Sequence, residues 1–467
     1  MTRGPRPRPL IPRIALASLL LSGPLLASTA YAAELPAPLG ACTGPDCPGD
    51  EPAPHNGNFA GRDASLNVFV GGDYQVQGRA AEVEGKVVAL GDLTIDKSQG
   101  GVFNMGVAGV GSRIVPPSGT DFVTVGGTAT VKDDNKLIIG GSDSRGQTAY
   151  GNLRYGTAAT GKMEITPTGR AVQDDAAGDS FKPLRSTIEK ASTCAARATA
   201  NGTVDISGNE ATFTGDGTSS RQVFDVKGDL GGKSPVGLAF HDIPAGATVV
   251  VNMLSPDATI NTYTGSGMAD DPMTKLRSKL LWNFPTATRA AITGSAQFQG
   301  SVMAGNPDGT VTLSTPGLNG RVYVAGNLVQ EGTSGSEIHQ YSFDGDLPEC
   351  DGPAPTSTPA PTATPSATAP ATPATPDGPG PSTSPSPGPS APTRQPQPSS
   401  TSTSTTSGTK TDGPGPAAPT SPSTPGGGRL AHTGAGLIAP VTGVAVLLLG
   451  AGGAVYAITR RRARRDG

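Results

Sequence analysis

Short runs of alternating apolar residues recur through residues 66–347 and limit the folds open to this chain. Each run is only a few residues long and is bounded by Gly, Asp, Asn or Ser. This pattern predicts β-strands joined by tight turns. The clearest runs are residues 66–70, 85–90, 122–125, 137–139, 248–251 and 321–324.

A degenerate internal repeat accompanies these runs. Residues 83–93 match residues 318–328 at most positions, and partial copies occur at residues 298–306 and 125–131. A glycine, a short strand, a second glycine beside Asp or Asn and another strand are typical of the coils of a parallel β-helix. We therefore expect an all-β fold in which a parallel β-helix occupies residues 60–350.

One segment follows a helical period instead. Its apolar residues recur at spacings of three and four, at Phe181, Leu184, Ile188, Ala191 and Ala195. This spacing predicts an amphipathic helix of about 15 residues with a single apolar stripe. We expect Asp179 or Ser180 to cap it, with Pro183 in its first turn. The helix is expected to lie along the side of the β-helix and cover a face.

Several segments of this region together resemble one known family. They are residues 66–73, 83–92, 280–288, 298–304, 318–323 and 337–345. In combination they resemble the choice-of-anchor A domain, a family of secreted bacterial adhesive modules. The resemblance implies a β-helix with a flanking helix, related in plan to ice-binding-like adhesive domains, and joined to a surface anchor.

The amino-terminal end has the pattern of a secretory signal peptide. Arg3, Arg6, Arg8 and Arg13 precede an apolar stretch at residues 14–26, and Ala30-Tyr31-Ala32 ends the segment. A basic region, a short apolar region and small residues before the cleavage point define such signals. We expect residues 1–32 to be the signal peptide, cleaved after Ala32 or Ala33. Residues 33–59 then form an amino-terminal extension.

Residues 351–429 consist mostly of Pro, Thr, Ser, Ala and Gly. This composition has no apolar periodicity and buries too little apolar surface to offset the entropy of the chain. The segment is therefore predicted to be a disordered stalk with a bias toward the extended polyproline II conformation. Its Ser and Thr residues leave open whether the stalk is glycosylated.

A second apolar segment lies near the carboxyl end, at residues 437–458, and lacks any charged residue. As a helix it would be about 33 Å long, which matches the hydrocarbon core of a membrane. A basic cluster follows directly, at Arg460, Arg461, Arg462, Arg464 and Arg465. Basic residues after a span mark its cytoplasmic side, so everything before this predicted transmembrane helix is expected outside the cell.

The five residues Leu430, Ala431, His432, Thr433 and Gly434 stand just before the apolar span. With the span and the basic tail, they resemble the LAxTG form of the cell-wall sorting signal of Gram-positive bacteria. The resemblance implies that a sortase attacks the Thr433 carbonyl, that Gly434 leaves with the tail, and that Thr433 is joined to peptidoglycan. The membrane then holds the precursor only before processing.

Charge and cysteine content fit an exported protein. Both predicted targeting ends are basic, so residues 33–433 are more acidic than the whole-chain formal charge of −3 indicates. An acidic displayed region argues against a nucleic-acid partner. Four cysteines remain in it, an even number that permits two disulfides without specifying their pairing. They are Cys42, Cys47, Cys194 and Cys350, and none has the spacing of metal ligands.

Few residues suggest catalysis. Glu82 and Glu84 alternate on one face of a predicted strand, and Asp pairs stand in predicted loops at residues 133–134, 174–175 and 270–271. Paired carboxylates serve glycoside hydrolysis, but these are interpreted as solvent-exposed turn residues. The Asp pairs leave calcium binding open, although no calcium-loop motif is present.

The remaining candidate residues favour structural roles. The histidines at 55, 241, 339 and 432 are scattered, and His339 is expected to be structural. Trp282 and Phe284 are expected in the core. Threonines also look scattered, which argues against the aligned rows of a flat ice-binding face.

Together these features predict a non-enzymatic, cell-wall-anchored adhesion protein with no cofactor or metal. A β-helical module on a stalk would bind an extracellular ligand whose identity the sequence leaves open. Two alternatives remain, a wall-attached carbohydrate-active β-helix enzyme and a self-assembling coat component.

Overall fold

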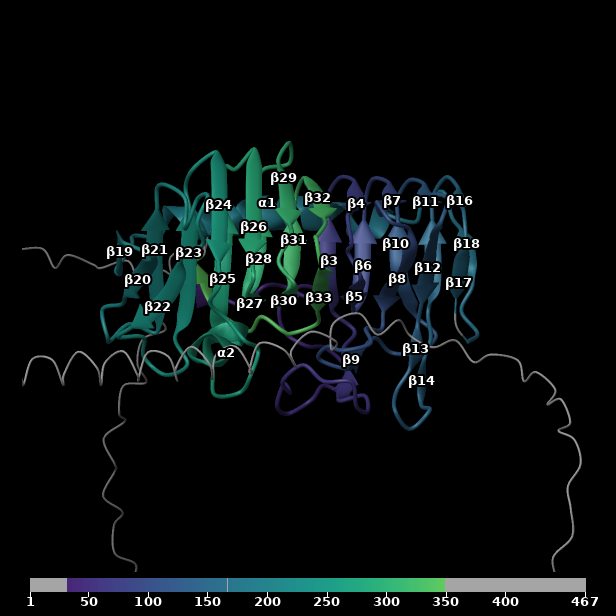
Figure 1. The fold of residues 1–467 in the computed structure, drawn as a ribbon, viewed down its shortest axis with the longest axis horizontal. Helices are drawn as coiled ribbons and strands as arrows, with labels where there is room; N and C mark the ends of the chain where they lie inside the picture. The colour runs from purple at the N-terminus through teal and green to yellow at the C-terminus, as the bar shows by residue number, and fades with distance from the viewer. Residues whose placement is uncertain (1–31, 166, 349–467) are drawn as a thin grey trace, which may run out of the picture. The chain divides into compact units, whose positions relative to one another are not determined.

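Three parallel β-sheets form the faces of a β-helix in the computed structural model, which describes residues 32–165 and 167–348 (Figure 1). The sheets have ten, eight and seven strands. Each full coil contributes one strand to each sheet, as β3, β4 and β5 do in the first coil. The predicted parallel β-helix with a flanking helix is confirmed.

The strands of each sheet lie side by side along the long axis of the β-helix (Figure 1). In spatial order, the ten-stranded sheet contains β18 (Ala171–Gln173), β15 (Asn152–Tyr155), β10 (Asp121–Val125), β6 (Lys86–Ala89), β3 (Leu66–Val70), β31 (Val322–Val324), β28 (Ser301–Ala304), β25 (Leu280–Phe284), β23 (Thr248–Met253) and β21 (Arg221–Val226). The eight-stranded sheet contains β16 (Ala159–Thr160), β11 (Ala129–Val131), β7 (Leu93–Ile95), β4 (Tyr74–Val76), β32 (Asn327–Gln330), β29 (Thr310–Leu313), β26 (Arg289–Gly294) and β24 (Asp257–Thr262). The seven-stranded sheet contains β17 (Met163–Ile165), β12 (Asn135–Ile139), β8 (Gly101–Gly106), β5 (Glu82–Glu84), β33 (Glu337–His339), β30 (Gly317–Asn319) and β27 (Gln297–Gln299).

Smaller elements complete the described part of the chain. Short strands form pairs, and one three-stranded sheet lies near an end of the β-helix (Figure 1). These strands are β1 (Ala32–Ala33), β34 (Leu347–Pro348), β2 (Gly61–Arg62), β9 (Ile114–Val115), β13 (Gly141–Ser142), β14 (Thr148–Ala149), β19 (Thr203–Ser207), β20 (Glu210–Thr214) and β22 (Gly237–His241). The helical elements are η1 (Asp179–Phe181), α1 (Lys182–Arg197), α2 (Pro272–Leu276) and η2 (Arg277–Lys279).

The coils do not stack in the order of the sequence. Strand β3, the first of the β-helix, pairs with β31 near the end of the chain, and β4 and β5 pair in the same way with β32 and β33. The chain therefore starts coiling in the middle, runs out to β18 at one end, and returns to the middle from β21 at the other. Figure 1 shows this as purple and blue coils meeting green coils at β3 and β31.

Helix α1 connects the two halves and covers the ten-stranded sheet. It packs against β23, β25, β28 and β31. Ile188 and Ala195 are fully buried there, in a cluster that includes Val250 and Leu281. Ser192 Oγ and Asn283 Oδ1 lie 2.5 Å apart, and Asn283 Nδ2 donates to the Ser192 carbonyl at 2.9 Å. The expected covering role of the helix is confirmed.

The start of α1 differs from the expectation. Neither Asp179 nor Ser180 caps the helix, because both belong to the 3₁₀ turn η1 that leads into it. Phe181 occupies the N-cap position without a side-chain hydrogen bond, and Pro183 lies in the first turn as expected. Asp179 forms an ion pair with Lys182 instead. The preceding turn thus takes over the role that a capping side chain would have.

The core is filled by alternate strand residues. Val87, Val123 and Leu153 lie in register on β6, β10 and β15 and are almost fully buried. Side chains alternate between the two faces of a strand, so the residues between them point out of the β-helix. Glycines turn the corner after β10 and β15 because the coils approach closely. A Cβ added at Gly126 would lie 2.2 Å from the Leu90 carbonyl oxygen, and one at Gly156 would lie 2.0 Å from that of Gly126.

Candidate binding face

One row of uncharged side chains runs across the outer face of the eight-stranded sheet. In β7, Thr94 stands between the buried Leu93 and Ile95, so its side chain must point outward. Strand pairing brings the equivalent residue of every strand into register with it. This threonine row consists of Thr160, Thr130, Thr94, Gln75, Val329, Thr312, Ala291 and Thr259.

The geometry of the threonine row follows from the sheet. Neighbouring strands are about 4.8 Å apart, so eight residues span about 34 Å at a regular spacing. Gln75 and Thr160 are exposed, and the other six are half-buried beside their neighbours. Each Thr offers one hydroxyl and one methyl group from a side chain with few rotamers. The row therefore presents a repeating pattern of polar and apolar groups.

The expectation that threonines are scattered is wrong. Five of them occupy one row, although unequal loops separate them along the chain. The row also crosses the junction at which β4 pairs with β32. That pairing joins Gln75 to Val329. These residues are far apart in the sequence, so no local sequence pattern reveals the pairing.

A ladder of side-chain hydrogen bonds holds the coils in register beside the threonine row. Asn327 Oδ1 accepts from the Asp73 amide at 2.8 Å, and Asp73 Oδ1 accepts from the Asp92 amide at 2.9 Å. Asp92 Oδ1 in turn accepts from the Thr128 amide at 2.7 Å. The ladder crosses the junction between the two halves, so it fixes the alignment of the threonine row at that point. Two of its acceptors, Asp92 and Asn327, are the Asp and Asn of the sequence repeat.

The two glutamates considered for catalysis are buried, not solvent-exposed as expected. Glu82 and Glu84 are 2% and 0% exposed on the seven-stranded sheet. Glu82 accepts from Asn104 Nδ2 at 2.9 Å and from the Gly109 amide at 2.7 Å. Glu84 accepts from Ser112 and from the amides of residues 113 and 340. The loop that follows β8 folds over this sheet, and its backbone amides donate hydrogen bonds to the two carboxylates.

Burial and neighbouring charge alter the protonation of this cluster. Loss of hydration, together with the charge of Glu337, raises the pKa of Glu82 to about 8. Burial acts to lower the pKa of His339, but its hydrogen bond to Glu337 and the nearby carboxylates outweigh burial and raise it. His339 also lies 2.8 Å from Asn319 Oδ1 and is 1% exposed. The cluster is closed to a substrate, and His339 has the structural role expected.

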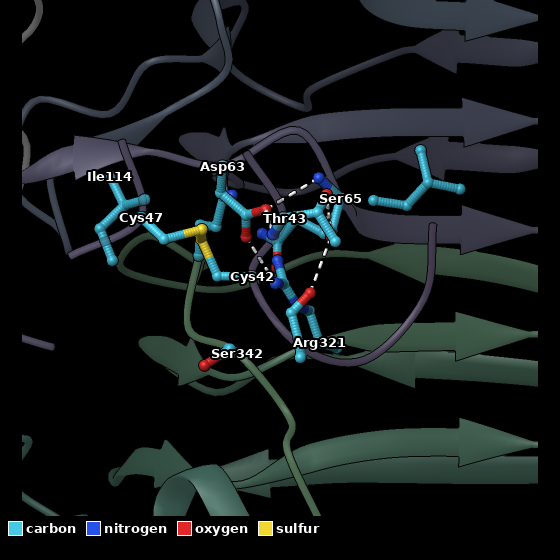
Figure 2. Close-up of polar contacts among 12 residues, drawn as sticks. Cys42, Thr43, Cys47, Asp63, Ser65, Ile114, Arg321 and Ser342 are labelled. Carbon is cyan, nitrogen blue, oxygen red and sulfur yellow. Dashed lines mark hydrogen bonds and ion pairs between the residues drawn. A yellow bond between two sulfur atoms is a disulfide. The ribbon is translucent and has the colours of Figure 1, made fainter. Parts of the chain in front are cut away.

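A buried ion pair fixes the part of the chain before β3, the amino-terminal segment, to the central coils, as Figure 2 shows. Arg321 Nη2 donates to Asp63 Oδ2 at 2.6 Å, and Arg321 Nε donates to the Gly40 carbonyl at 3.0 Å. Asp63 Oδ1 accepts from the amides of Thr43 and Ser65. The sequence shows Arg321 only as part of its repeat. Its distant partner could not be inferred from local pattern.

The cysteines beside this ion pair form a disulfide between Cys42 and Cys47 (Figure 2). Their sulfur atoms lie close to the Asp63 carboxylate, and these three residues are the metal-like cluster found in the described part of the chain. Bonded sulfurs cannot be thiolate ligands, and Arg321 already pairs with Asp63, so this is not a metal site. Cys194 is disulfide-bonded, while Cys350 lies outside the described residues.

The remaining residues singled out from the sequence lie either in the core or outside the described part of the chain. Trp282 and Phe284 are fully buried in β25, as expected of core residues. The sorting motif at residues 430–434, the apolar span at 437–458 and the basic tail lie outside the described residues, as do the stalk and most of the signal peptide. Among helices that are described, none has the length and hydropathy needed to cross a membrane.

Comparison with known proteins identifies a family. No curated protein matches the chain significantly. Among solved structures, an ice-binding protein from the Antarctic ascomycete Antarctomyces psychrotrophicus is 12% identical, with a TM-score of 0.25 over 60% of this chain and 96% of its own. An ice-binding protein domain from Shewanella frigidimarina is 13% identical, with a TM-score of 0.23 over 62% of this chain and 100% of its own.

A family model described as an ice-binding-like adhesive domain matches residues 61–340, which is more than half of the chain. The chain therefore belongs to the family of ice-binding-like adhesive domains.

Proposed function

We propose that this chain is a cell-surface adhesion protein that binds a solid with a repeating surface through the threonine row. The observation that carries the proposal is the in-register alignment of eight uncharged, outward-facing residues on neighbouring strands. A row of this length matches a periodic surface better than it matches a small molecule, which needs a concave site. Membership of an adhesive family supports the same function.

Two classes of solid fit the chemistry of the threonine row, and the family description favours the first. Ice presents ordered water, which can continue the hydrogen bonds of the Thr hydroxyls while the methyl groups cover apolar area. Crystalline polysaccharide presents regularly spaced hydroxyl groups. Neither surface requires a charge on the protein, and the threonine row contains none.

We further propose that the chain is anchored to the cell wall. The motif at residues 430–434, the apolar span at 437–458 and the following arginines support a sortase that joins Thr433 to peptidoglycan. Residues 351–429 would then be the stalk between the wall and the β-helix. Their Pro content favours an extended chain, which would carry the threonine row away from the wall.

Adsorption of the purified chain to ice and to crystalline cellulose tests the binding face. The double substitution Thr94→Lys and Thr130→Lys places two charged, bulky side chains in the threonine row, and we expect the adsorbed fraction to fall at least tenfold. Thr203→Lys is the control, because Thr203 is an exposed threonine on β19, outside the three large sheets. Circular dichroism and thermal melting establish that both variants are folded.

The outcomes separate clearly. Equal adsorption of the double variant and the control would exclude the threonine row as the binding face. Failure of the unmodified chain to adsorb to either solid would contradict the proposed class of target. Adsorption to one solid only would identify the target class.

A further inference from the structure

A cleft of about 420 Å³ lies on a different face from the threonine row. Its floor is the outer side of the ten-stranded sheet, at β6, β10 and β15. Pro38 and Ala64 of the amino-terminal segment and Phe181 before α1 also line it. This volume lies within the range of small-ligand sites in proteins, about 300–1,000 Å³.

The floor of the cleft combines apolar and hydrogen-bonding groups. Val88, Thr124 and Arg154 lie in register across the three strands. Val88 is 1% exposed and Thr124 is 3% exposed, so they form the deepest part. A polar floor flanked by the side chains of Pro38 and Phe181 can contact both the hydroxyl groups and the apolar face of a sugar ring.

On one side of the cleft, the charged groups already pair with one another. Arg154 Nε donates to Asp121 Oδ2 at 2.7 Å, and Arg154 Nη1 donates to Asp174 Oδ2 at 3.0 Å. Asn152 Nδ2 donates to the other oxygen of Asp121 at 3.0 Å. Arg154 thus shares its charge between two carboxylates, and Asp121 has both oxygens engaged. This group of residues has a net charge of about −1.

The Lys86 ammonium is the charge in the cleft that has no such partner. No ion pair joins Lys86 to a carboxylate within the described parts of the chain. Its side chain is half-buried beside Leu66, with which it pairs across β3 and β6. Burial lowers the pKa of Lys86, against the opposing charges of Asp121 and Asp63. A half-buried cation gains most when an anion replaces its lost hydration.

We propose that this cleft binds an acidic sugar of the hexuronate class, with its carboxylate on Lys86. A single carboxylate neutralises Lys86, whereas a doubly charged phosphate would face repulsion from Asp121 and Asp174. The sugar hydroxyls then meet Asn152 and the polar edge of Arg154. The apolar face of the ring packs on Phe181 and Pro38. The protein would thus have a small-molecule site separate from its adhesive face.

Titration calorimetry of the purified full chain with a galacturonate trisaccharide tests the proposal. We expect Lys86→Met to weaken binding about tenfold or more, because a charge-assisted hydrogen bond is lost. Lys86→Arg keeps the charge and should stay within a few-fold of the unmodified chain. Lys132→Met, at an exposed lysine after β11, is the matched control and should bind normally. A neutral galactose trisaccharide should bind at least tenfold more weakly than the acidic one.

Other results overturn the proposal. Equal binding by Lys86→Met and the control, equal binding of the neutral and acidic sugars, or no binding of the acidic sugar at millimolar concentration would each reject it. Inorganic phosphate that binds more tightly than the trisaccharide would reject the sugar class. The Lys86 variants should adsorb to solids as the unmodified chain does, so this test and that of the threonine row can fail independently.

Discussion

Arg321 Nη2 lies 2.6 Å from Asp63 Oδ2, and the two side chains are 0% and 2% exposed. The residues stand far apart in sequence, at the start of the β-helix and beside its last coil. Burial acts to raise the pKa of Asp63, but the charge and hydrogen bond of Arg321 and the amides of Thr43 and Ser65 outweigh it, so the pKa is lowered. This pair therefore links the amino-terminal segment to the junction between the halves.

Removing one partner of this pair should strongly destabilise the protein. Asp63→Ala leaves the Arg321 guanidinium buried without its counter-ion, and such losses typically cost about 3–5 kcal/mol. We expect the free energy of unfolding in urea to fall by that amount. The control is Asp257→Ala, which breaks an exposed, solvent-screened ion pair with Arg289 and should cost far less. Equally small losses of unfolding free energy in both variants would show that the Arg321–Asp63 pair stabilises the fold no more than an exposed ion pair does.

Lowering the pH from about 8 to about 5 should stabilise the β-helix. The pKa of Glu82 is about 8 in the folded protein, above the ordinary value of 4.5, so the folded state binds the extra proton between these values. Stability therefore falls as the pH rises through this window. His339 acts in the same direction, because its raised pKa gives stability that is complete below pH 6.5 and is lost as the pH rises through its folded pKa.

The variant Glu82→Gln separates the contribution of Glu82 to this pH dependence from that of His339. Glutamine mimics the protonated carboxyl, so the variant should lose about 3–4 kcal/mol less than the unmodified chain between pH 5 and pH 8. Urea unfolding at several pH values measures the difference. Glu210→Gln, which removes an exposed carboxylate on β20, is the control variant. An unmodified chain with equal stability at both pH values would contradict the assignment.

The packing of α1 on the ten-stranded sheet gives a third prediction. Ile188 is 0% exposed against Val250 and Leu281, so Ile188→Ala creates a cavity and should cost about 2–4 kcal/mol. Ser186→Ala, at an exposed position of the same helix, should change stability by less than about 0.5 kcal/mol. Thermal unfolding followed by circular dichroism measures both. Equal melting temperatures would mean that the helix contributes little to the stability of the sheet it covers.

Local pattern was sufficient to predict some of the elements of this fold. The alternation at residues 66–70 and the helical spacing from Phe181 to Ala195 each depend on neighbouring residues, and both elements are present. The pairing of β3 with β31 depends on contacts between distant coils. Every coil of a repeat offers similar strand edges, so similarity between coils cannot specify which of them are neighbours.

The candidate sites were less predictable for the same reason. Glu82 and Glu84 flank the buried Val83, and alternation correctly directs them out of the core. Whether an outward side chain meets solvent depends on the loop that folds over it, and that loop has no periodic signal. Thr94 and Thr312 join one row only because the halves meet at β4 and β32.

Covalent anchoring to the wall predicts a specific change on fractionation of cells. If a sortase joins Thr433 to peptidoglycan, the unmodified chain should resist extraction by hot detergent and be released when the wall is digested by a muramidase. Thr433→Ala removes the side chain that the enzyme is expected to recognise at the cleavage point, so this variant should be extracted by detergent with the membranes. Thr424→Ala, in the predicted stalk, is the matched control and should remain with the wall. Complete extraction of the unmodified chain by detergent, without digestion of the wall, would exclude covalent attachment and leave the apolar span at residues 437–458 as the anchor.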